Sequence, residues 1–543
     1  MTNGIVRVPV PTNEPIRAYG PGSAEKASLK KRLDQMLSEQ IEVPVIVGGQ
    51  EIRTGKTVET VCPHDHGHVL ATVHQAGADE VDQAVEATAE AWRSWSEMSW
   101  EARSAVFLKA ADLLAGPWRD TLNAATMLNQ SKTVFQAEID SACELIDFWR
   151  FNPHYMRQLY TEQPGSVSGL WDYVEYRALE GFVFAVTPFN FTSIAGNLPT
   201  APALMGNVAL WKPASTAPLS GYYIMKLLEE AGLPPGVINF LPGRGAQVGN
   251  PVMARAELAG IHFTGSTSVF QGMWEQVGGG IADYHTYPRI VGETGGKDFV
   301  FAHPSADVQS VVIALVRGAF EYQGQKCSAA SRAYIPKSLW SQVRSGLERE
   351  VGDIEMGSPM DFRNFMCAVI DEASFDNTMS YIDHAKSNDG FEIVCGGEGD
   401  KSTGYFVQPT VVLSKDPRSK LMQEEIFAPV LTLYVYDDAD LGATLELCDT
   451  TSPYALTGAI FGTDRSEIVK MANALRHSAG NFYINDKPTG AVVGQQPFGG
   501  SRASGTNDKA GSAANLLRWT SQRSIKETFV SPTSFTYPHM GEE

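Results

Sequence analysis

The sequence has little positive charge, few cysteines and no long apolar run. It carries 43 Lys and Arg against 62 Asp and Glu, a formal net charge of −19. Such an acidic chain is a poor partner for nucleic acid or an anionic membrane, although a local basic patch is compatible with that total. The six cysteines form no C-x-x-C pair, which argues against a zinc ribbon or disulfide framework and indicates a reducing compartment. No run of about 18 apolar residues occurs, so no membrane span is expected.

Targeting signals are also missing from the first 32 residues. They contain neither an apolar core nor an Arg-rich amphipathic pattern, so we expect no secretory signal and no mitochondrial presequence. We therefore expect a cytoplasmic protein from a bacterial source, or a mitochondrial matrix protein from a eukaryotic one. The 543 residues, of which 43% are hydrophobic, predict a globular protein of two or three domains.

From residue 181 the pattern alternates between short apolar strands and amphipathic helices. Such alternation predicts a parallel sheet covered on both faces, and so an α/β fold. The expected strands of this first series are Phe182–Thr187, Val208–Lys212, Val237–Leu241, Gly260–Thr264 and Phe299–Ala302. A second series runs from about 311 to 500. Residues 158–180 break the pattern, and the alternation in 170–176 predicts a two-sided hairpin that leaves the main body.

Two short motifs carry the chemistry. Gly324–Ala329 (GQKCSA) supplies the thiol of Cys327, and Gly292–Lys297 (GETGGK) supplies the carboxylate of Glu293. A thiol nucleophile needs a group that activates it, or that activates the water releasing its product. The alternatives are an inert buried thiol and a loop carboxylate that caps a helix or pairs with Lys297.

These motifs resemble the glutamate and cysteine motifs of the NAD(P)-dependent aldehyde dehydrogenases. Four further motifs follow in the order and approximate spacing of that family: Thr187–Phe191 (TPFNF), Trp211–Pro213 (WKP), Phe263–Ser266 (FTGS) and Glu424–Pro429 (EEIFAP). A narrower resemblance, to the 1-pyrroline-5-carboxylate dehydrogenases, is carried by Asn481–Lys487, Val493–Gly500 and Ser504–Lys509. Those enzymes oxidise L-glutamate γ-semialdehyde to L-glutamate in proline breakdown. The resemblance covers roughly residues 40–540.

The resemblance implies a Rossmann-type cofactor domain, an α/β catalytic domain and a β-flap for oligomerisation. We expect an N-terminal arm at 1–40, the cofactor domain at 41–157 and 181–305, and the catalytic domain at 306–505. The flap and tail are expected at 158–180 and 506–543. The flap would extend the sheet of a second copy, giving at least a homodimer.

The resemblance also assigns catalytic roles. Cys327 would attack the aldehyde carbon, and Glu293 would activate the hydrolytic water. Asn190 would stabilise the oxyanion together with the Cys327 backbone N–H. The Pro188–Asn190 stretch alone indicates merely a turn.

For the cofactor, the resemblance implies NAD held by six residues. These are Thr187, Lys212, Gly265, Ser266, Glu425 and Phe427. Lys212 ends an apolar strand, where open α/β sheets bind ligands, and Gly265 and Ser266 precede a helix whose amides could face the pyrophosphate. No G-x-G-x-x-G is present, and Phe270 stands where many family members have a second glycine.

For the substrate, backbone amides of Gly490 and Ala491 would bind the α-carboxylate, with the Ser328 hydroxyl nearby. The narrower family often has Ser at position 491, so one side-chain contact is missing here. Phe191 and Phe498 would wall the aliphatic chain, with ordinary core packing as the alternative. Glu144 would lie near the ammonium group, and Ser328 could instead begin a helix.

Cys62, His64, His66 and His68 would share one face of a continuous strand, an arrangement that zinc would accept. The family needs no metal and the segment aligns with a hairpin turn, so we expect no metal site.

Two other functions stay open. One is acyl transfer to coenzyme A, which Glu293 disfavours. The other is a non-catalytic structural protein, which would not need Cys327, Glu293 and Asn190 together.

Overall fold

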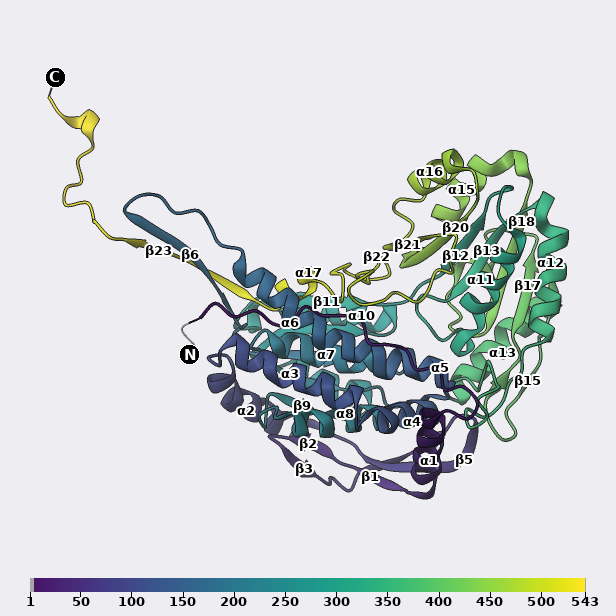
Figure 1. Cartoon of the computed structure of the whole chain (residues 1–543), viewed down its shortest axis with the longest axis horizontal. Coiled ribbons are helices and arrows are strands. Elements are labelled where there is room, and N and C mark those ends of the chain that lie inside the picture. The colour runs from purple at the N-terminus through teal and green to yellow at the C-terminus, as the bar shows by residue number, and fades with distance from the viewer. Residues whose placement is uncertain (1–3, 543) are drawn as a thin grey trace.

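The computed structural model describes residues 4–542, and in them two lobes are each built on a seven-stranded sheet (Figure 1). The first sheet has the order β11-β10-β7-β8-β9-β2-β3. Its strands are β2 Val45–Val47, β3 Gln50–Ile52, β7 Phe182–Val186, β8 Val208–Lys212, β9 Ile238–Phe240, β10 Leu258–Thr264 and β11 Arg289–Glu293. The strands from β11 to β9 are parallel, and β2 and β3 add an antiparallel edge. The apolar runs of β8 and β10 are buried throughout, as expected for strands covered on both faces.

Helices cover this sheet on both faces. They are α2 Ala78–Trp95, α3 Trp100–Ala115, α4 Arg119–Gln130, α6 Leu145–Thr161, α7 Thr192–Leu204, α8 Pro218–Ala231, α9 Gly245–Met253 and α10 Thr267–Gly279. A short α5, Val134–Ala137, runs through a π-helical turn at Glu138–Glu144 into α6. The helix α1, Ala24–Ser38, packs on α4. A three-stranded sheet of β1 Ile41–Val43, β4 Thr57–Cys62 and β5 Asp65–His74 completes this lobe.

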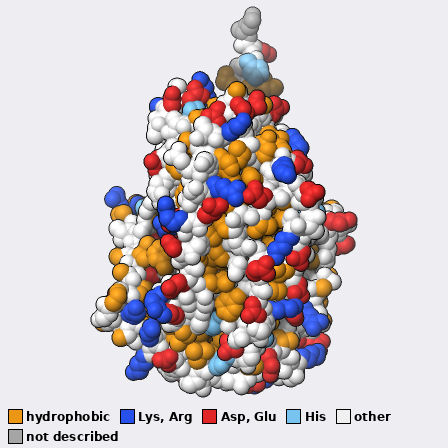
Figure 2. Space-filling model, turned by 90° about the vertical axis from the view of Figure 1, so that its right-hand side faces the viewer, with side chains coloured by type: hydrophobic (Ala, Val, Ile, Leu, Met, Phe, Trp, Pro, Cys, Tyr) orange, Lys and Arg blue, Asp and Glu red, His pale blue; other side chains and the backbone are white. Residues whose placement is uncertain are grey.

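The second sheet has the order β14-β17-β18-β13-β12-β20-β21, parallel except for its edge strand β14. Its strands are β12 Asp298–Ala302, β13 Ala330–Pro336, β14 Phe391–Cys395, β17 Thr410–Ser414, β18 Val430–Tyr436, β20 Thr457–Phe461 and β21 Asn481–Ile484. The accompanying helices are α11 Val308–Phe320, α12 Lys337–Gly352, α13 Glu372–Lys386, α14 Lys420–Gln423, α15 Leu441–Thr450 and α16 Arg465–Ala474. On the face drawn in Figure 2, acidic and basic side chains are interspersed among apolar ones.

One expected strand lies in the other sheet. Residues 299–302 belong to β12, which pairs with β13 and β20 rather than with the first sheet. The chain therefore changes sheet between Glu293 and Asp298, before the expected boundary at 305. Strand periodicity cannot distinguish two adjacent parallel sheets, because both are buried in the same way.

The segment at 158–180 is one arm of a two-stranded ribbon rather than a self-contained hairpin. Its strand β6, Leu170–Arg177, pairs antiparallel with β23, Ser521–Thr528, from the end of the chain. The ribbon and the tail project away from both lobes (Figure 1). Residues 506–520, which we expected in the flap, pack on the body instead: α17, Ala513–Leu517, lies on α6, and Trp519 is fully buried against His262.

Candidate functional site

A cofactor-sized cavity opens where the chain order of the first sheet reverses. From β7 the chain proceeds to β8 and β9 on one side, whereas β10 and β11 lie on the other. Ligands bind at such a switch point, beyond the carboxyl ends of the strands. The cavity there has a volume of about 710 Å³ and is mostly apolar. All six residues expected to hold the cofactor line it: Thr187, Lys212, Gly265, Ser266, Glu425 and Phe427.

Two features suit the far end of this cavity to a dinucleotide. Lys212 is the last residue of β8; burial lowers its pKa to about 8, and its Nζ donates to the Pro213 carbonyl at 3.0 Å. Gly265 and Ser266 line the cavity and lead directly into α10, so the positive end of this helix begins beside it. Phe270 stacks on Phe263 and fills the space above Gly292, where any Cβ would lie 2.3 Å from its ring. Phe270 therefore fits at this position because residue 292 has no side chain.

The other end is formed by the Glu424–Pro429 segment. The Gly296 amide donates to Glu425 Oε1 at 2.9 Å, and burial raises the pKa of this carboxyl to about 7. Phe427 adopts a left-handed φ of 60° and packs edge-on against Phe189, with ring centroids 5.8 Å apart. The carboxylate and the ring therefore have fixed positions at the end nearest the thiol.

Cys327 lies where this cavity meets a second one. Of the described residues, it alone lines both. It follows an irregular segment in which Tyr322, Gln323 and Gly324 all have positive φ. A Cβ on Gly324 would lie 2.2 Å from the Ala428 carbonyl oxygen, so this turn admits only glycine. Burial, with nearby acids adding to it, raises the pKa of the Cys327 thiol well above its usual value, so the resting thiol is protonated.

Asn190 supports the loop that bears Cys327. Its Nδ2 donates to the Gln325 carbonyl at 3.1 Å, and its side chain lines the cofactor cavity beside the thiol. The amide retains a second N–H that can point toward an oxygen bound at Cys327.

Glu293 occupies a position turned away from the thiol. It ends β11, and its Oε2 accepts a hydrogen bond from the Gly500 amide at 3.0 Å. Glu293 neither caps a helix nor pairs with Lys297, the two alternatives considered from the sequence. Burial raises its pKa well above the usual value, and the Lys509 ammonium partly offsets this shift. Within the described chain, the next two residues, Thr294 and Gly295, line the cofactor cavity, whereas the lining of neither cavity includes Glu293.

The second cavity has a volume of about 350 Å³ and contains every residue expected to bind substrate: Glu144, Phe191, Ser328, Gly490, Ala491 and Phe498. Gly490 has a left-handed φ of 99°, which exposes the backbone of the 490–491 loop. Among the described residues, neither the Gly490 nor the Ala491 amide has a hydrogen-bond acceptor. Ser328 does not begin a helix; its hydroxyl is 2.7 Å from the Thr489 hydroxyl beside this loop.

Glu144 lines the same cavity, at the end of the π-helical turn. Its Oε2 accepts from the Ser193 hydroxyl at 2.8 Å. Burial, together with the neighbouring Asp140, raises its pKa to about 8. The cavity is thus lined both by free amide donors and by a carboxyl group.

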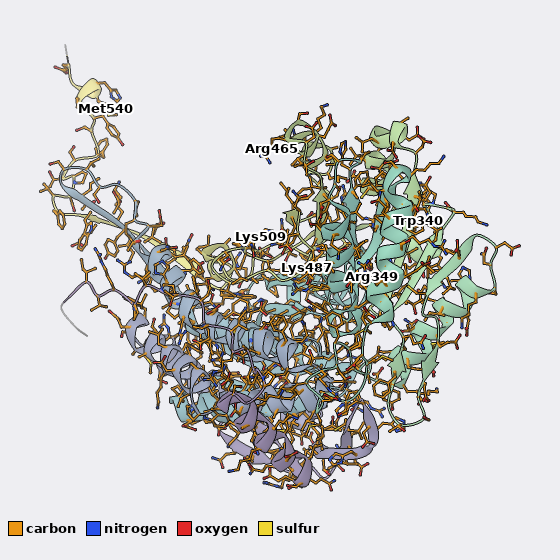
Figure 3. All side chains as sticks on the ribbon, turned by 45° about the vertical axis from the view of Figure 1, so that its right-hand side comes forward. Trp340, Arg349, Arg465, Lys487, Lys509 and Met540 are labelled. Atoms are coloured by element: carbon orange, nitrogen blue, oxygen red, sulfur yellow. The ribbon has the colours of Figure 1, made fainter. Side chains whose placement is uncertain are left out.

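Sequence reasoning missed several charged residues of this second cavity. The charged ones are Glu14 of the arm, the acids Asp140, Asp147 and Glu321, and the bases Arg317, Lys326 and Lys487, and the neutral Asn13 of the arm was missed with them. Lys487 and Lys509 both lie in the region where the two lobes meet (Figure 3). The sequence did hold one indication of these residues: four acids, at 138, 140, 144 and 147, lie in a stretch that is otherwise largely apolar. Buried acids need partners, so basic or polar residues were to be expected near them.

The histidine segment is not one strand. A turn at 63–64 separates β4 from β5, so the alternation that would align the four residues does not apply. His64 is buried near the Ser131 hydroxyl, and His66 Nε2 contacts the Lys401 carbonyl. In residues 4–542, no three His, Cys, Asp or Glu side chains are arranged to hold a metal ion. Nor does that range contain a helix long and apolar enough to cross a membrane.

Comparison with known proteins agrees with this geometry. The model of the aldehyde dehydrogenase family matches residues 51–525. This chain belongs to the aldehyde dehydrogenase family. Both the family resemblance and the α/β fold class expected from the sequence are confirmed.

Relatives of this family member are available as sequences and as structures. The delta-1-pyrroline-5-carboxylate dehydrogenase of Dictyostelium discoideum is 55% identical, over 98% of this chain and 96% of its own. The Homo sapiens enzyme of that name is 49% identical, over 97% and 94%. The crystal structure of the Mycobacterium tuberculosis enzyme bound with NAD is 52% identical and covers all of both chains, with a TM-score of 0.96.

Proposed function

We propose that this aldehyde dehydrogenase oxidises L-glutamate γ-semialdehyde, formed from 1-pyrroline-5-carboxylate, to L-glutamate with NAD, as in proline degradation. The observation that carries the proposal is the pairing of two cavities at one thiol. One cavity suits a dinucleotide, and the other is lined by two free amides and a carboxyl group, which complement the α-carboxylate and the α-ammonium. The names of the relatives and the NAD-bound structure support the same activity.

The first half-reaction begins at Cys327. Because its pKa is raised, the thiol must lose its proton before or as sulfur attacks the aldehyde carbon. The new C–S bond converts the carbonyl into an oxyanion. The second N–H of Asn190 and the Cys327 amide are the donors for this charge, which becomes full in the transition state. Protonation of that oxygen would give a thiohemiacetal.

Bound NAD would accept the hydride that leaves the thiohemiacetal carbon. Lys212 and the amides at the start of α10 would hold the adenosine and pyrophosphate, while Glu425 and Phe427 would hold the nicotinamide end. A thioester then remains on Cys327. Glu293 would leave the Gly500 amide, take a proton from water and direct the hydroxide to the thioester carbon. This step releases the carboxylate and restores the thiol.

Substrate comparison tests the proposal. The rate constant kcat/KM for glutamate γ-semialdehyde, followed by NADH absorbance, should exceed that for pentanal at least about a hundredfold. Pentanal leaves two or three donors unpaired at about 1–3 kcal/mol each, and each 1.4 kcal/mol is tenfold. Similar kcat/KM values for the two aldehydes would contradict the proposed specificity for glutamate γ-semialdehyde. Adding coenzyme A should leave the rate unchanged, because Glu293 directs the thioester to water.

The wider organisation belongs to the same proposal. The first lobe would be the cofactor domain, the second the catalytic domain, and the β6–β23 ribbon the element that joins a second copy into at least a dimer. The exposed Trp171 and the paired strands of the ribbon support this role. All six cysteines are free, which suits the cytoplasm of a bacterium or the matrix of a mitochondrion.

A further inference from the structure

The extended arm before α1 forms part of the substrate cavity. Asn13, Glu14 and Ile16 line this cavity together with the anchor loop, residues 489–495. These arm residues are at least 119 positions from Phe135, the next lining residue along the chain, so the contact is a product of the fold.

Asn13 connects the two walls that face the ends of the substrate. Its Nδ2 donates to Asp147 Oδ2 at 2.8 Å, on the helix that continues from Glu144. The same Nδ2 donates to the Val493 carbonyl at 2.7 Å, three residues from Gly490. Its Oδ1 accepts from Gln495 Nε2 at 3.0 Å. One amide group thereby joins the Glu144 wall to the anchor loop.

The arm itself is fixed in place. The Glu14 amide donates to Asp147 Oδ1 at 2.8 Å, and the Glu14 carboxylate pairs with Arg119 at 2.6 Å and Arg150 at 2.7 Å. Further along, the Tyr19 hydroxyl donates to Glu138 at 2.8 Å. Arg119 and Glu138 are fully buried, so these contacts give Asn13 a defined position before substrate enters.

We propose that Asn13 is a positioning residue that sets substrate specificity. It holds the Gly490 and Ala491 amides at a fixed separation from Glu144, so that one molecule can place its carboxylate and its ammonium against both walls. The inference rests on the proposed function. It adds a determinant outside the catalytic residues, in a segment that sequence reasoning treated simply as an arm.

The geometry distinguishes this role from a general structural one. The Asn13 contacts end at the loop and at Asp147, and none reaches the Cys327 loop or the cofactor cavity. Loosening the loop therefore weakens binding of a substrate that uses both walls. It leaves the thiol, the oxyanion donors and NAD binding unchanged.

The test uses Asn13→Ala, with Thr12→Ala as the matched control, since Thr12 is exposed and has no hydrogen bond among the described residues. Asn13→Ala should raise KM for glutamate γ-semialdehyde at least about tenfold, the effect of losing about 1.4 kcal/mol of positioning. Its kcat/KM for pentanal and its KM for NAD should stay within about twofold, and Thr12→Ala should match wild type. Asn13→Asp keeps the shape and loses the donor, so it should show at least the same KM increase even if the Ala variant folds poorly.

Each result has a distinct meaning. An equal loss with pentanal, or an unchanged KM in both folded variants, would overturn the role of Asn13. The proposed function is judged on wild type alone: a wild-type enzyme without preference for the semialdehyde would overturn that proposal, whatever the variants do. The thermal unfolding midpoint of each variant confirms that folded proteins are compared.

Discussion

The two cavities that meet at Cys327 differ in size and in chemistry. The cofactor cavity, of about 710 Å³, is lined by apolar side chains and exposed backbone, with Lys212 and Glu425 as its charged residues in the described chain. The substrate cavity, of about 350 Å³, is lined by five acids and three bases. The first suits recognition by shape and by the amides of a helix end. The second suits recognition of a small molecule that carries charges of both signs.

This difference assigns separate tasks to the two sides of one thiol. A cofactor used by many enzymes can be held by backbone and a few side chains, whereas selecting one aldehyde requires partners for its particular charges. Unpaired charges or donors in the smaller cavity would reject simple aldehydes. Changes at the junction should therefore stop the reaction that joins the two sides, while changes on one side should affect recognition on that side alone.

Removing the junction thiol should have the largest effect. Cys327→Ala should abolish dehydrogenase turnover, because loss of a nucleophile usually costs several powers of ten. NAD should still bind, since Cys327 is one of many residues that line its cavity and the six residues expected to hold NAD are unchanged. Steady-state NADH formation measures the first effect, and NAD titration by protein fluorescence measures the second. More than about a hundredth of the wild-type kcat would contradict covalent catalysis by this residue.

Changing the base separates the two half-reactions. Glu293→Gln should lower steady-state turnover about a hundredfold, since a positioned general base typically contributes that much or more. The first burst of NADH should survive better, because hydride transfer precedes water activation. Rapid mixing of enzyme and NAD with the semialdehyde resolves the burst from the steady rate. Equal losses in both phases would contradict the role of Glu293 in hydrolysis.

The sequence predicted the cofactor side more completely than the substrate side. Strand endings at Lys212 and Thr264, followed by turn and helix, are local patterns, and local patterns locate the carboxyl edge of a parallel sheet. The family motifs then named Cys327, Glu293 and Asn190, which lie on segments that the fold does bring to one region. Their catalytic roles remain predictions.

The rest depends on contacts between distant segments. Asn13 reaches the cavity from the arm, and β6 finds its partner β23 more than 340 positions away, which no periodicity reveals. The same applies to β12, whose apolar pattern suits either sheet. Even Glu144, suggested by resemblance, owes its position to a π-helical turn, which apolar periodicity does not reveal. A turn of this kind places one extra residue in the helix and changes which side chains face the cavity.

The smallest effect should come from the substrate side. In the free enzyme the Glu144 pKa is raised to about 8, so this carboxyl is mostly neutral at pH 6.5 and ionises as pH rises through 8. An ionised carboxylate binds the substrate ammonium better than a neutral acid does. The ratio of kcat/KM for the semialdehyde to that for pentanal should therefore rise by up to about 25-fold between pH 6.5 and 8.5, because the ionised fraction of such a group rises from about 3% to about 76%.

Using this ratio cancels the ionisation of Cys327, which affects both substrates alike. Glu144→Gln should lower the ratio at high pH and remove its pH dependence. Glu162→Gln, the same change at an exposed position beyond the end of α6, should keep the wild-type profile. Circular dichroism at each pH would show that the variants stay folded. If the Glu144→Gln enzyme keeps the increase of the kcat/KM ratio with pH, the substrate ammonium must bind elsewhere in the cavity. The proposal that the anchor loop and Glu144 bind the two charges of the substrate would then be wrong.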